Sequence, residues 1–175
     1  DGVYKEPALR GIALAFDIDR DGRSEVVTEL WEQGKPMLYV LDGATGKVEH
    51  GRESPFDLTV RSGKRSRCHP IGRIAYLHGR KNPPAVVLKY EASGRVPTHA
   101  VALDAELKTR WHVKAKNTAI AHLPSVGDVD GDGNDEIILG TTLLDDDGSI
   151  LWEQRARNHA DCTAIFQPTA EGNNA

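Results

Sequence analysis

The stretch "SVGDVDGDGNDEIILG", residues 125–140, carries the strongest structural signal in the chain. It places four acids, Asp128, Asp130, Asp132 and Glu136, in one short segment bracketed by apolar runs and interrupted by glycines. Carboxylates this close disfavour one another's ionised state, so the segment needs a cation. Oxygen ligands at alternate positions suit Ca²⁺, which takes about six to eight oxygens. We therefore expect these acids and the carbonyl of Asn134 to bind one Ca²⁺.

A second copy of the pattern, "FDIDRDGRSEVV", covers residues 16–27. Its expected ligands occupy the same relative places: Asp17, Asp19, Asp21, the carbonyl of Arg23, and Glu25. A lone Asp-Gly turn is explained equally well as a solvated turn between strands. Two complete copies favour calcium as the cofactor.

These segments are not EF-hands. An EF-hand loop needs a bidentate Glu at its twelfth position and helices on both sides. The twelfth positions here are Thr28 and Leu139, and the flanking segments are short, apolar and β-branched, which is typical of strands. The pattern predicts calcium-binding strand-loop-strand turns.

The two turns belong to a longer repeat. Asp17 and Asp128 are 111 residues apart, and a third apolar run, "HPIGRIAYL", lies about midway between them. Each unit offers a strand, a loop, a second strand and a hairpin, and four short strands in about 40 to 55 residues are typical of β-propeller blades. We predict an all-β fold with little helix, a β-propeller fragment of about three four-stranded blades plus the first strand of a fourth.

We expect one partial domain over residues 1–175, with blades at approximately 8–54, 66–116 and 121–156 and the next blade starting at 159–175. A closed ring takes about four to eight blades, so the remaining blades of a parent propeller are expected partners.

The middle unit lacks the acids. Arg73, Ala75 and Leu77 stand where the other units have aspartates, so we expect no calcium there. A further acidic run, Asp145 to Asp147, is consecutive, and we expect its side chains to point in different directions. Together with Gly148, it favours a tight hairpin turn over a third metal loop.

Composition bounds the class of protein. The chain has 175 residues, 39% hydrophobic and 27% charged, which is ordinary for a soluble globular protein. Its formal charge of −4 would be offset by two Ca²⁺ ions, which argues against a nucleic-acid binder driven by bulk charge. No apolar run approaches the roughly 20 residues of a membrane span.

The compartment is inferred from weaker signals. The chain starts at Asp1 without an initiator Met, which is typical of a mature or excised piece, so the lack of a signal segment leaves secretion open. Cys68 and Cys162 cannot form a disulfide framework and are expected to be small buried or half-buried filler, with a single bridge as the alternative. We expect a secreted, periplasmic or cell-surface protein.

A possible functional face lies opposite the acidic turns. In a propeller, the connections between blades share one face, and His122, His159 and Asp161 fall in two such connections. A histidine there is more often a solvent-facing structural residue, but two histidines and an aspartate on adjacent blades could hold an ion or substrate. No catalytic base is assigned.

Two further groups have alternative interpretations. A basic loop on the same expected face is either solvated, which we favour slightly, or a cradle for anionic groups: Arg61, Lys64, Arg65, Arg67 and His69. The tryptophans, Trp31, Trp111 and Trp152, are expected to pack between blades before they serve as sugar-stacking platforms.

The stretch from His122 to Asp161 resembles the calcium-binding propeller of the rhamnogalacturonan lyases of polysaccharide lyase family eleven. In that family, a histidine precedes "VxDVDGDGxDEI", an "IDDDG" turn follows, and "GHGD" opens the next blade. The matching segments here are His122, residues 128–137, residues 145–148, and "NHAD" at 158–161.

The resemblance implies an eight-bladed propeller that cleaves rhamnogalacturonan by β-elimination, with an acidic polysaccharide as substrate. It also implies that His122 and His159 line the ion- and substrate-binding face. A cation there would neutralise the uronate carboxylate, a base would take the C5 proton, and the C4 oxygen would depart. By itself the fragment is expected to be inactive. The alternative is a non-catalytic FG-GAP-type propeller that binds carbohydrate or protein.

Overall fold

Three four-stranded antiparallel sheets make up the described part of this computed structural model, which is residues 12–33, 35–55, 69–91, 98–115, 123–154 and 163–165. Sheet 1 contains β1 (Ala13–Phe16), β2 (Glu25–Glu32), β3 (Lys35–Asp42) and β4 (Val48–Glu53). Sheet 2 contains β5 (His69–Ala75), β6 (Ala85–Glu91), β7 (Thr98–Leu103) and β8 (Thr109–Ala115). Sheet 3 contains β9 (Ser125–Gly127), β10 (Glu136–Leu139), β11 (Thr142–Leu144) and β12 (Ile150–Glu153).

Within each sheet, every strand pairs with the strand that follows it in the chain. The described residues contain strands and turns and no helix, so the all-β prediction and the three four-stranded units are confirmed. No helix in this part of the chain is long and apolar enough to cross a membrane.

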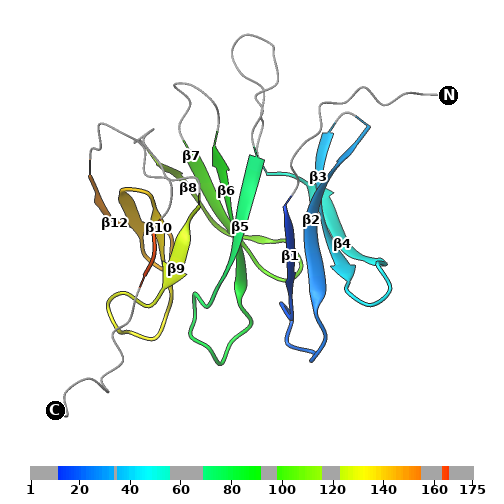
Figure 1. Ribbon diagram of the computed structural model, residues 1–175, viewed down its shortest axis with the longest axis horizontal. Helices are drawn as coiled ribbons and strands as arrows, with labels where there is room; N and C mark the ends of the chain where they lie inside the picture. The colour runs from blue at the N-terminus through cyan, green and yellow to red at the C-terminus, as the bar shows by residue number, and fades with distance from the viewer. Residues whose placement is uncertain are drawn as a thin grey trace, which may run out of the picture.

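The first strands of the three sheets lie next to one another. Figure 1 shows β5 between β1 and β9, and β5 contacts both of them. The approach to β1 is close: a Cβ on Gly72 would lie 2.1 Å from Ile12 Cδ1 and 2.6 Å from Leu14 Cδ1. A glycine at this point of β5 therefore lets two sheets meet along their first strands.

The central strands of sheet 2, β6 and β7, are buried on both faces. One face packs against sheet 1 with large side chains, including Leu88, Val101 and Leu103. The other face packs against sheet 3 and is rich in alanine, as at Ala100 and Ala102. Strands covered on both sides carry continuous apolar runs, and "AVVLKY" and "AVAL" in β6 and β7 fit that rule.

A buried polar network joins sheets 1 and 2. The Tyr90 hydroxyl donates to Glu29 Oε2 at 2.7 Å and lies 2.9 Å from Ser54 Oγ. All three residues are buried. Burial raises the pKa of the Glu29 carboxyl above its ordinary value of 4.5, against the hydrogen bonds from Tyr90 and Ser54, which lower it.

The segment after sheet 3 is described only at residues 163–165, and no strand is assigned there. These residues still contact β9. Ser125 Oγ donates to the Thr163 carbonyl, and a Cβ on Gly127 would lie 3.1 Å from Ile165 Cγ2. Residues 163–165 therefore lie beside β9, and the first strand of a further unit stays a prediction.

We predict a pH-dependent stability difference between the wild type and Glu29→Gln. Because the folded pKa of Glu29 is raised, the folded state binds the proton more tightly than the unfolded state does. Its contribution to stability is present below pH 4.5 and is lost as the pH rises through the folded pKa. Chemical denaturation between pH 4 and pH 8 should show Glu29→Gln gaining stability relative to wild type as the pH rises.

The matched variant is Tyr90→Phe, which removes a hydrogen bond to the buried carboxyl. It should cost about 1–3 kcal/mol at neutral pH, and less in the Glu29→Gln background because no buried charge is then left under-solvated. Parallel stability profiles for wild type and Glu29→Gln would show that Glu29 does not titrate differently on folding.

Candidate metal centres

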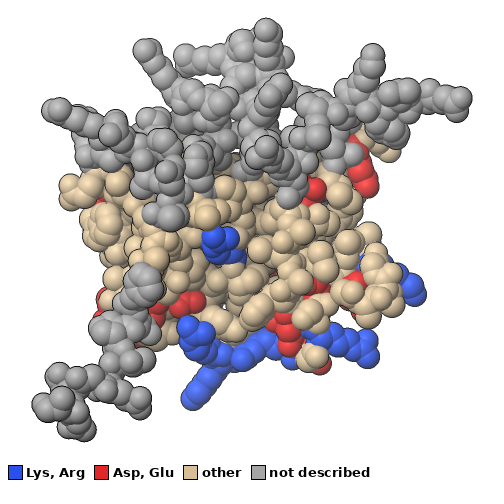
Figure 2. Space-filling view, viewed as in Figure 1, with Lys and Arg blue, Asp and Glu red and all other residues tan. Residues whose placement is uncertain are grey.

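The two acidic turns lie at the same edge of the molecule. One joins β1 to β2 and the other joins β9 to β10, and both lie at the lower edge in Figure 1. Acidic and basic side chains gather along this edge in Figure 2. The two copies therefore share one edge of the molecule, with the β5–β6 turn between them.

The β1–β2 turn is folded around its own carboxylates. Asp17 Oδ2 accepts from the Gly22 amide at 3.1 Å, and Asp19 Oδ1 accepts from the Asp21 amide at 3.0 Å. Glu25, the first residue of β2, accepts from the Ile18 amide at 2.9 Å. The loop is thus held in a ring with its acids turned inward.

The β9–β10 turn repeats this network position by position. Asp128 Oδ2 accepts from the Gly133 amide at 3.2 Å, Asp130 Oδ1 accepts from the Asp132 amide at 3.1 Å, and Glu136 Oε2 accepts from the Val129 amide at 2.5 Å. Equal sequence spacing has therefore produced equal geometry.

Left-handed backbone is needed at two positions in each turn. Gly22 and Gly133 have φ of 91° and 94°, and Gly131 has φ of 84°. The residue that corresponds to Gly131 in the first turn is Arg20, at φ 69°. A non-glycine residue there is strained, so the first turn keeps its shape against a local cost.

Each turn brings three acids together. Ligand oxygens of Asp17, Asp19 and Glu25 lie within 4.8 Å of one another, as do those of Asp128, Asp130 and Glu136. The other expected ligands are not in these groups. Asp21 and Asp132 instead accept from the amides of Arg23 and Asn134, both at 2.8 Å, and ligation by the Arg23 and Asn134 carbonyls stays a prediction.

The buried glutamates make these acidic clusters energetically unfavourable unless a cation is bound. Glu25 is 4% exposed and Glu136 is fully buried, and burial, opposed by backbone hydrogen bonds, raises the pKa of both carboxyls. Glu136 Oε1 and Asp17 Oδ1 are buried and lack a hydrogen-bond partner in the described structure. Buried oxygens without partners are unusual, and a hard cation would satisfy them. The donor set therefore fits Ca²⁺.

The expectation for Asp145 to Asp147 was wrong in one respect. Their carboxylate oxygens can lie within 4.8 Å of one another, because the tight turn curls the backbone and consecutive side chains converge. The hairpin itself is confirmed: the Asp145 amide donates to Ser149 O at 2.8 Å, and the Gly148 amide donates to Asp145 O at 2.9 Å. The three acids are not buried, so water can solvate them.

Trp111 packs between sheets 2 and 3, as predicted. Its ring lies against the apolar cluster between these sheets, and its Nε1 donates to the Asp146 carbonyl at 2.8 Å. Trp152 is 42% exposed on β12, so packing is not shown for it. The Trp31 side chain lies outside the described residues.

The turn between β5 and β6 uses protein groups where the other turns have acids. Arg73, which the sequence aligns with the first aspartate, lies inside β5 and not in the turn, and its Nε donates to the Pro124 carbonyl at 3.0 Å. The backbones of Tyr76 and Asp135 pair, and Asp135 Oδ2 accepts from the Tyr76 amide at 2.7 Å. Arg80 lies 3.9 Å from Asp135 Oδ1. That this turn binds no calcium stays a prediction.

Asp135 was missed by the sequence reasoning. It is 5% exposed and links the β9–β10 turn to the β5–β6 turn. The sequence held one signal that Asp135 is buried. It stands directly before Glu136, and the rest of that strand is apolar.

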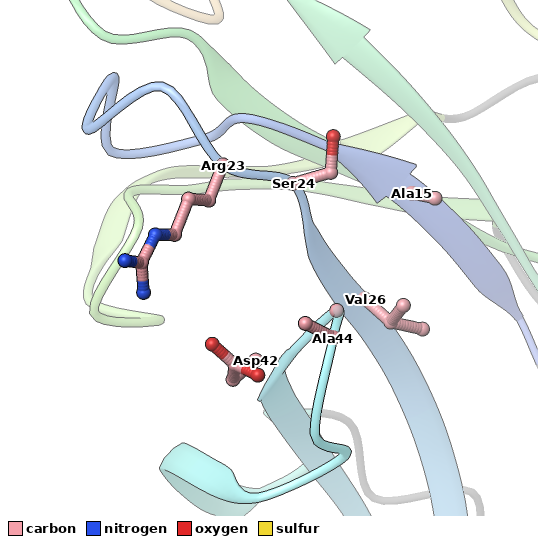
Figure 3. Close-up of a pocket in the computed structure, with 7 residues that line it drawn as sticks. Ala15, Arg23, Ser24, Val26, Asp42 and Ala44 are labelled. Atoms are coloured by element: carbon pink, nitrogen blue, oxygen red, sulfur yellow. The ribbon is translucent and has the colours of Figure 1, made fainter.

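A hollow of about 450 Å³ lies beside the first turn. Figure 3 shows Arg23 and Asp42 on one side of it and Ala15 and Val26 on the other. The Thr45 hydrogen bonds, aided by the Arg23 charge, lower the pKa of Asp42. Ala15 and Val26 are register partners on the face of sheet 1 opposite the one that packs on sheet 2.

Several expected site residues lie outside the described residues. These are His122, His159 and Asp161 of the expected functional face, the basic residues Arg61, Lys64, Arg65 and Arg67, and both cysteines. The side chain of His69 is also outside them. Their grouping remains a prediction from the sequence.

Comparison with known proteins identifies the family. Residues 32–175 match the family described as rhamnogalacturonan lyase family 11, C-terminal domain, and the chain belongs to that family. It is 30% identical over 177 residues to the rhamnogalacturonan endolyase YesW of Bacillus subtilis. This alignment covers 79% of this chain and 28% of YesW.

A second relative is the rhamnogalacturonan exolyase YesX of the same organism, 30% identical over 201 residues, with 91% of this chain and 32% of YesX covered. The crystal structure of exotype YesX superposes with a TM-score of 0.69 and 26% identity over 84% of this chain and 30% of that one. The chain thus spans about a third of the length of these relatives.

We predict that Ca²⁺ binds once in each acidic turn. Calcium at about one hundred times its Kd should raise the free energy of unfolding by about 2.7 kcal/mol per turn, because it binds the folded state only. Asp17→Asn and Asp128→Asn should each remove one site in calorimetry and about half of the calcium-dependent stabilisation.

Asp104→Asn is the matched control. Asp104 Oδ1 accepts from the amides of Glu106 and Lys108 in the hairpin turn of sheet 2, outside both clusters. This variant should keep the full calcium response. An absence of calcium heat in the wild type, together with equal melting in calcium and in chelator, would rule the calcium sites out.

Proposed function

We propose that this chain is part of a calcium-stabilised β-propeller of a secreted or cell-surface rhamnogalacturonan lyase that cleaves its polysaccharide by β-elimination. The observation that carries the proposal is the family match over residues 32–175. The relatives named for the same substrate support it, one as an endolyase and one as an exolyase.

The arrangement of the sheets supports the propeller. Each sheet is a four-stranded meander, and the first strands lie side by side, as they do around a propeller axis. In such a ring each blade is covered on both faces, as sheet 2 is. The face of sheet 1 that carries the hollow beside Ala15 and Val26 would then pack against a preceding blade.

The acidic turns support a structural role for calcium. The ion would offset the repulsion among the acids and satisfy the buried oxygens of Asp17 and Glu136. In each turn the protein supplies a preformed ring of inward-facing carboxylates, held by backbone amides. Calcium there would brace the ends of β1, β2, β9 and β10 and would not contact the substrate.

The chemistry belongs to the opposite face in this proposal. His122 precedes β9, and His159 and Asp161 precede the expected first strand of the next blade, so these two connections would bring neutral imidazoles and a carboxylate together. A cation on that face supplies charge neutralisation for the uronate carboxylate, which acidifies its C5 proton. The histidines would orient that group or hold a proton, with the base and the other contacts supplied by further blades.

The direct test is an assay of the intact protein on rhamnogalacturonan. β-Elimination leaves an unsaturated uronide, so absorbance of that product should rise with time in the presence of calcium. A polygalacturonate control without rhamnose should give a much lower rate. If neither polymer gives a product, the proposed lyase function is ruled out and a binding propeller of the FG-GAP type is favoured.

Mutants of the intact protein should distinguish the roles of the two faces. His122→Ala and His159→Ala should each lower turnover by at least about tenfold with a nearly unchanged melting temperature. At saturating calcium, Asp130→Ala should lower the melting temperature and leave turnover nearly unchanged, because it disturbs one acidic turn far from the reacting groups. Wild-type activity in both histidine variants would reduce these histidines to surface residues.

A further inference from the structure

The turn between β5 and β6 is basic where the corresponding turns of the other two sheets are acidic. Residues 69–90 contain no Asp or Glu, although the chain has 26 of them, and this turn carries Arg80 and Lys81. The neighbouring β1–β2 turn adds Arg20 and Arg23, and all four side chains are on exposed residues. Figure 2 shows Lys and Arg side chains gathered along the lower edge, where Figure 1 places both turns. We call these four residues the basic edge.

The cations of the basic edge take little part in the fold. Among the described residues, Arg80 alone of the four forms an ion pair, 3.9 Å from Asp135 Oδ1, and the arginine side chain is 74% exposed. The acids of the neighbouring turn are held within their own loop, where Asp17 and Asp19 accept from backbone amides. The basic edge therefore presents cations to solvent, where an anionic ligand can reach them.

The β5–β6 turn holds Arg80 in a fixed frame. The Gly79 amide donates to the Tyr76 carbonyl at 3.2 Å, and the Asn82 amide donates to the Gly79 carbonyl at 3.1 Å. The Arg80 guanidinium lies 5.0 Å from the centroid of the Tyr76 ring, within the range of a cation–π contact. A guanidinium held in this way loses less freedom when it binds, and its planar fork matches a carboxylate.

We propose that the basic edge is a second, non-catalytic surface that binds the uronate carboxylates of the acidic polysaccharide. The choice of polymer rests on the proposed function. The basic edge lies with the acidic turns, opposite the face assigned above to His122 and His159, so a polymer bound there leaves the reacting groups free. Two weak sites on one protein hold a polymer better than either site alone.

Uronate fits this surface better than the phosphates of a nucleic acid. Arginine binds a carboxylate through two parallel hydrogen bonds. The formal charge of the chain is −4, which would repel a densely charged phosphate backbone more than a polymer whose uronates alternate with neutral sugars.

Calorimetric titration of the intact protein with a short oligogalacturonate at saturating Ca²⁺ tests the surface. The double variant Arg80→Gln, Lys81→Gln should weaken binding by at least about fivefold, because charge-assisted hydrogen bonds are lost. Its binding should also depend less on salt concentration. The matched control is Lys35→Gln, Lys114→Gln, which removes the same charge at exposed lysines of β3 and β8 and should bind like the wild type.

Arg80→Lys separates geometry from charge. It keeps the charge and removes the planar fork, so it should weaken binding by less than the double variant does. Unchanged binding in the double variant would overturn the proposal, as would tighter binding of a short DNA duplex than of the oligogalacturonate by the wild type.

The non-catalytic role has its own readout. Turnover of a short rhamnogalacturonan oligosaccharide should be the same in the wild type and in Arg80→Gln, Lys81→Gln, and a lower turnover in the variant would overturn that role. If the wild type forms no lyase product, the lyase function fails, while the oligogalacturonate titration still decides whether the basic edge binds uronate.

Discussion

Burial of the central strands of sheet 2, β6 and β7, on both faces is the constraint around which the described structure is organised. Large apolar side chains fill the space towards sheet 1, and alanines allow the close approach of sheet 3. Such a sheet has little room for charge except at the ends of its strands. Lys89 and Tyr90 are exceptions, as polar groups of β6 that are buried, and the Tyr90 hydroxyl has Glu29 and Ser54 as partners. Polar chemistry is therefore concentrated at the two edges where the strands begin and end.

The acidic turns show how far local sequence can determine geometry. Three amide-to-carboxylate hydrogen bonds recur at corresponding positions of the two turns, although Arg20 stands in one turn where Gly131 stands in the other. The shared features are the spacing of the acids and the glutamate that opens the second strand. Ligand spacing was therefore enough to predict which carboxylates meet, for three of the four acids in each turn.

The fold was predictable for a related reason. Short apolar runs with regular spacing indicated four-stranded units, and the strands occur where those runs are. Glu29 could have been identified as buried too, because it lies two residues after Val27 and so on the same face of β2. The Asp135–Tyr76 link could not, because it depends on which turns of different sheets become neighbours, and local spacing does not contain that information.

The link between Tyr76 and Asp135 has a mechanical consequence. The Tyr76 backbone holds the β9–β10 turn, while its ring meets Phe16, the residue before the first acidic turn, edge-on at a centroid distance of 6.5 Å. A displacement of either acidic turn is therefore transmitted through one aromatic residue to the other. If the turns bind calcium as proposed, removal of the ions would loosen this edge of the three sheets as a single cooperative unit, although the turns are far apart in sequence.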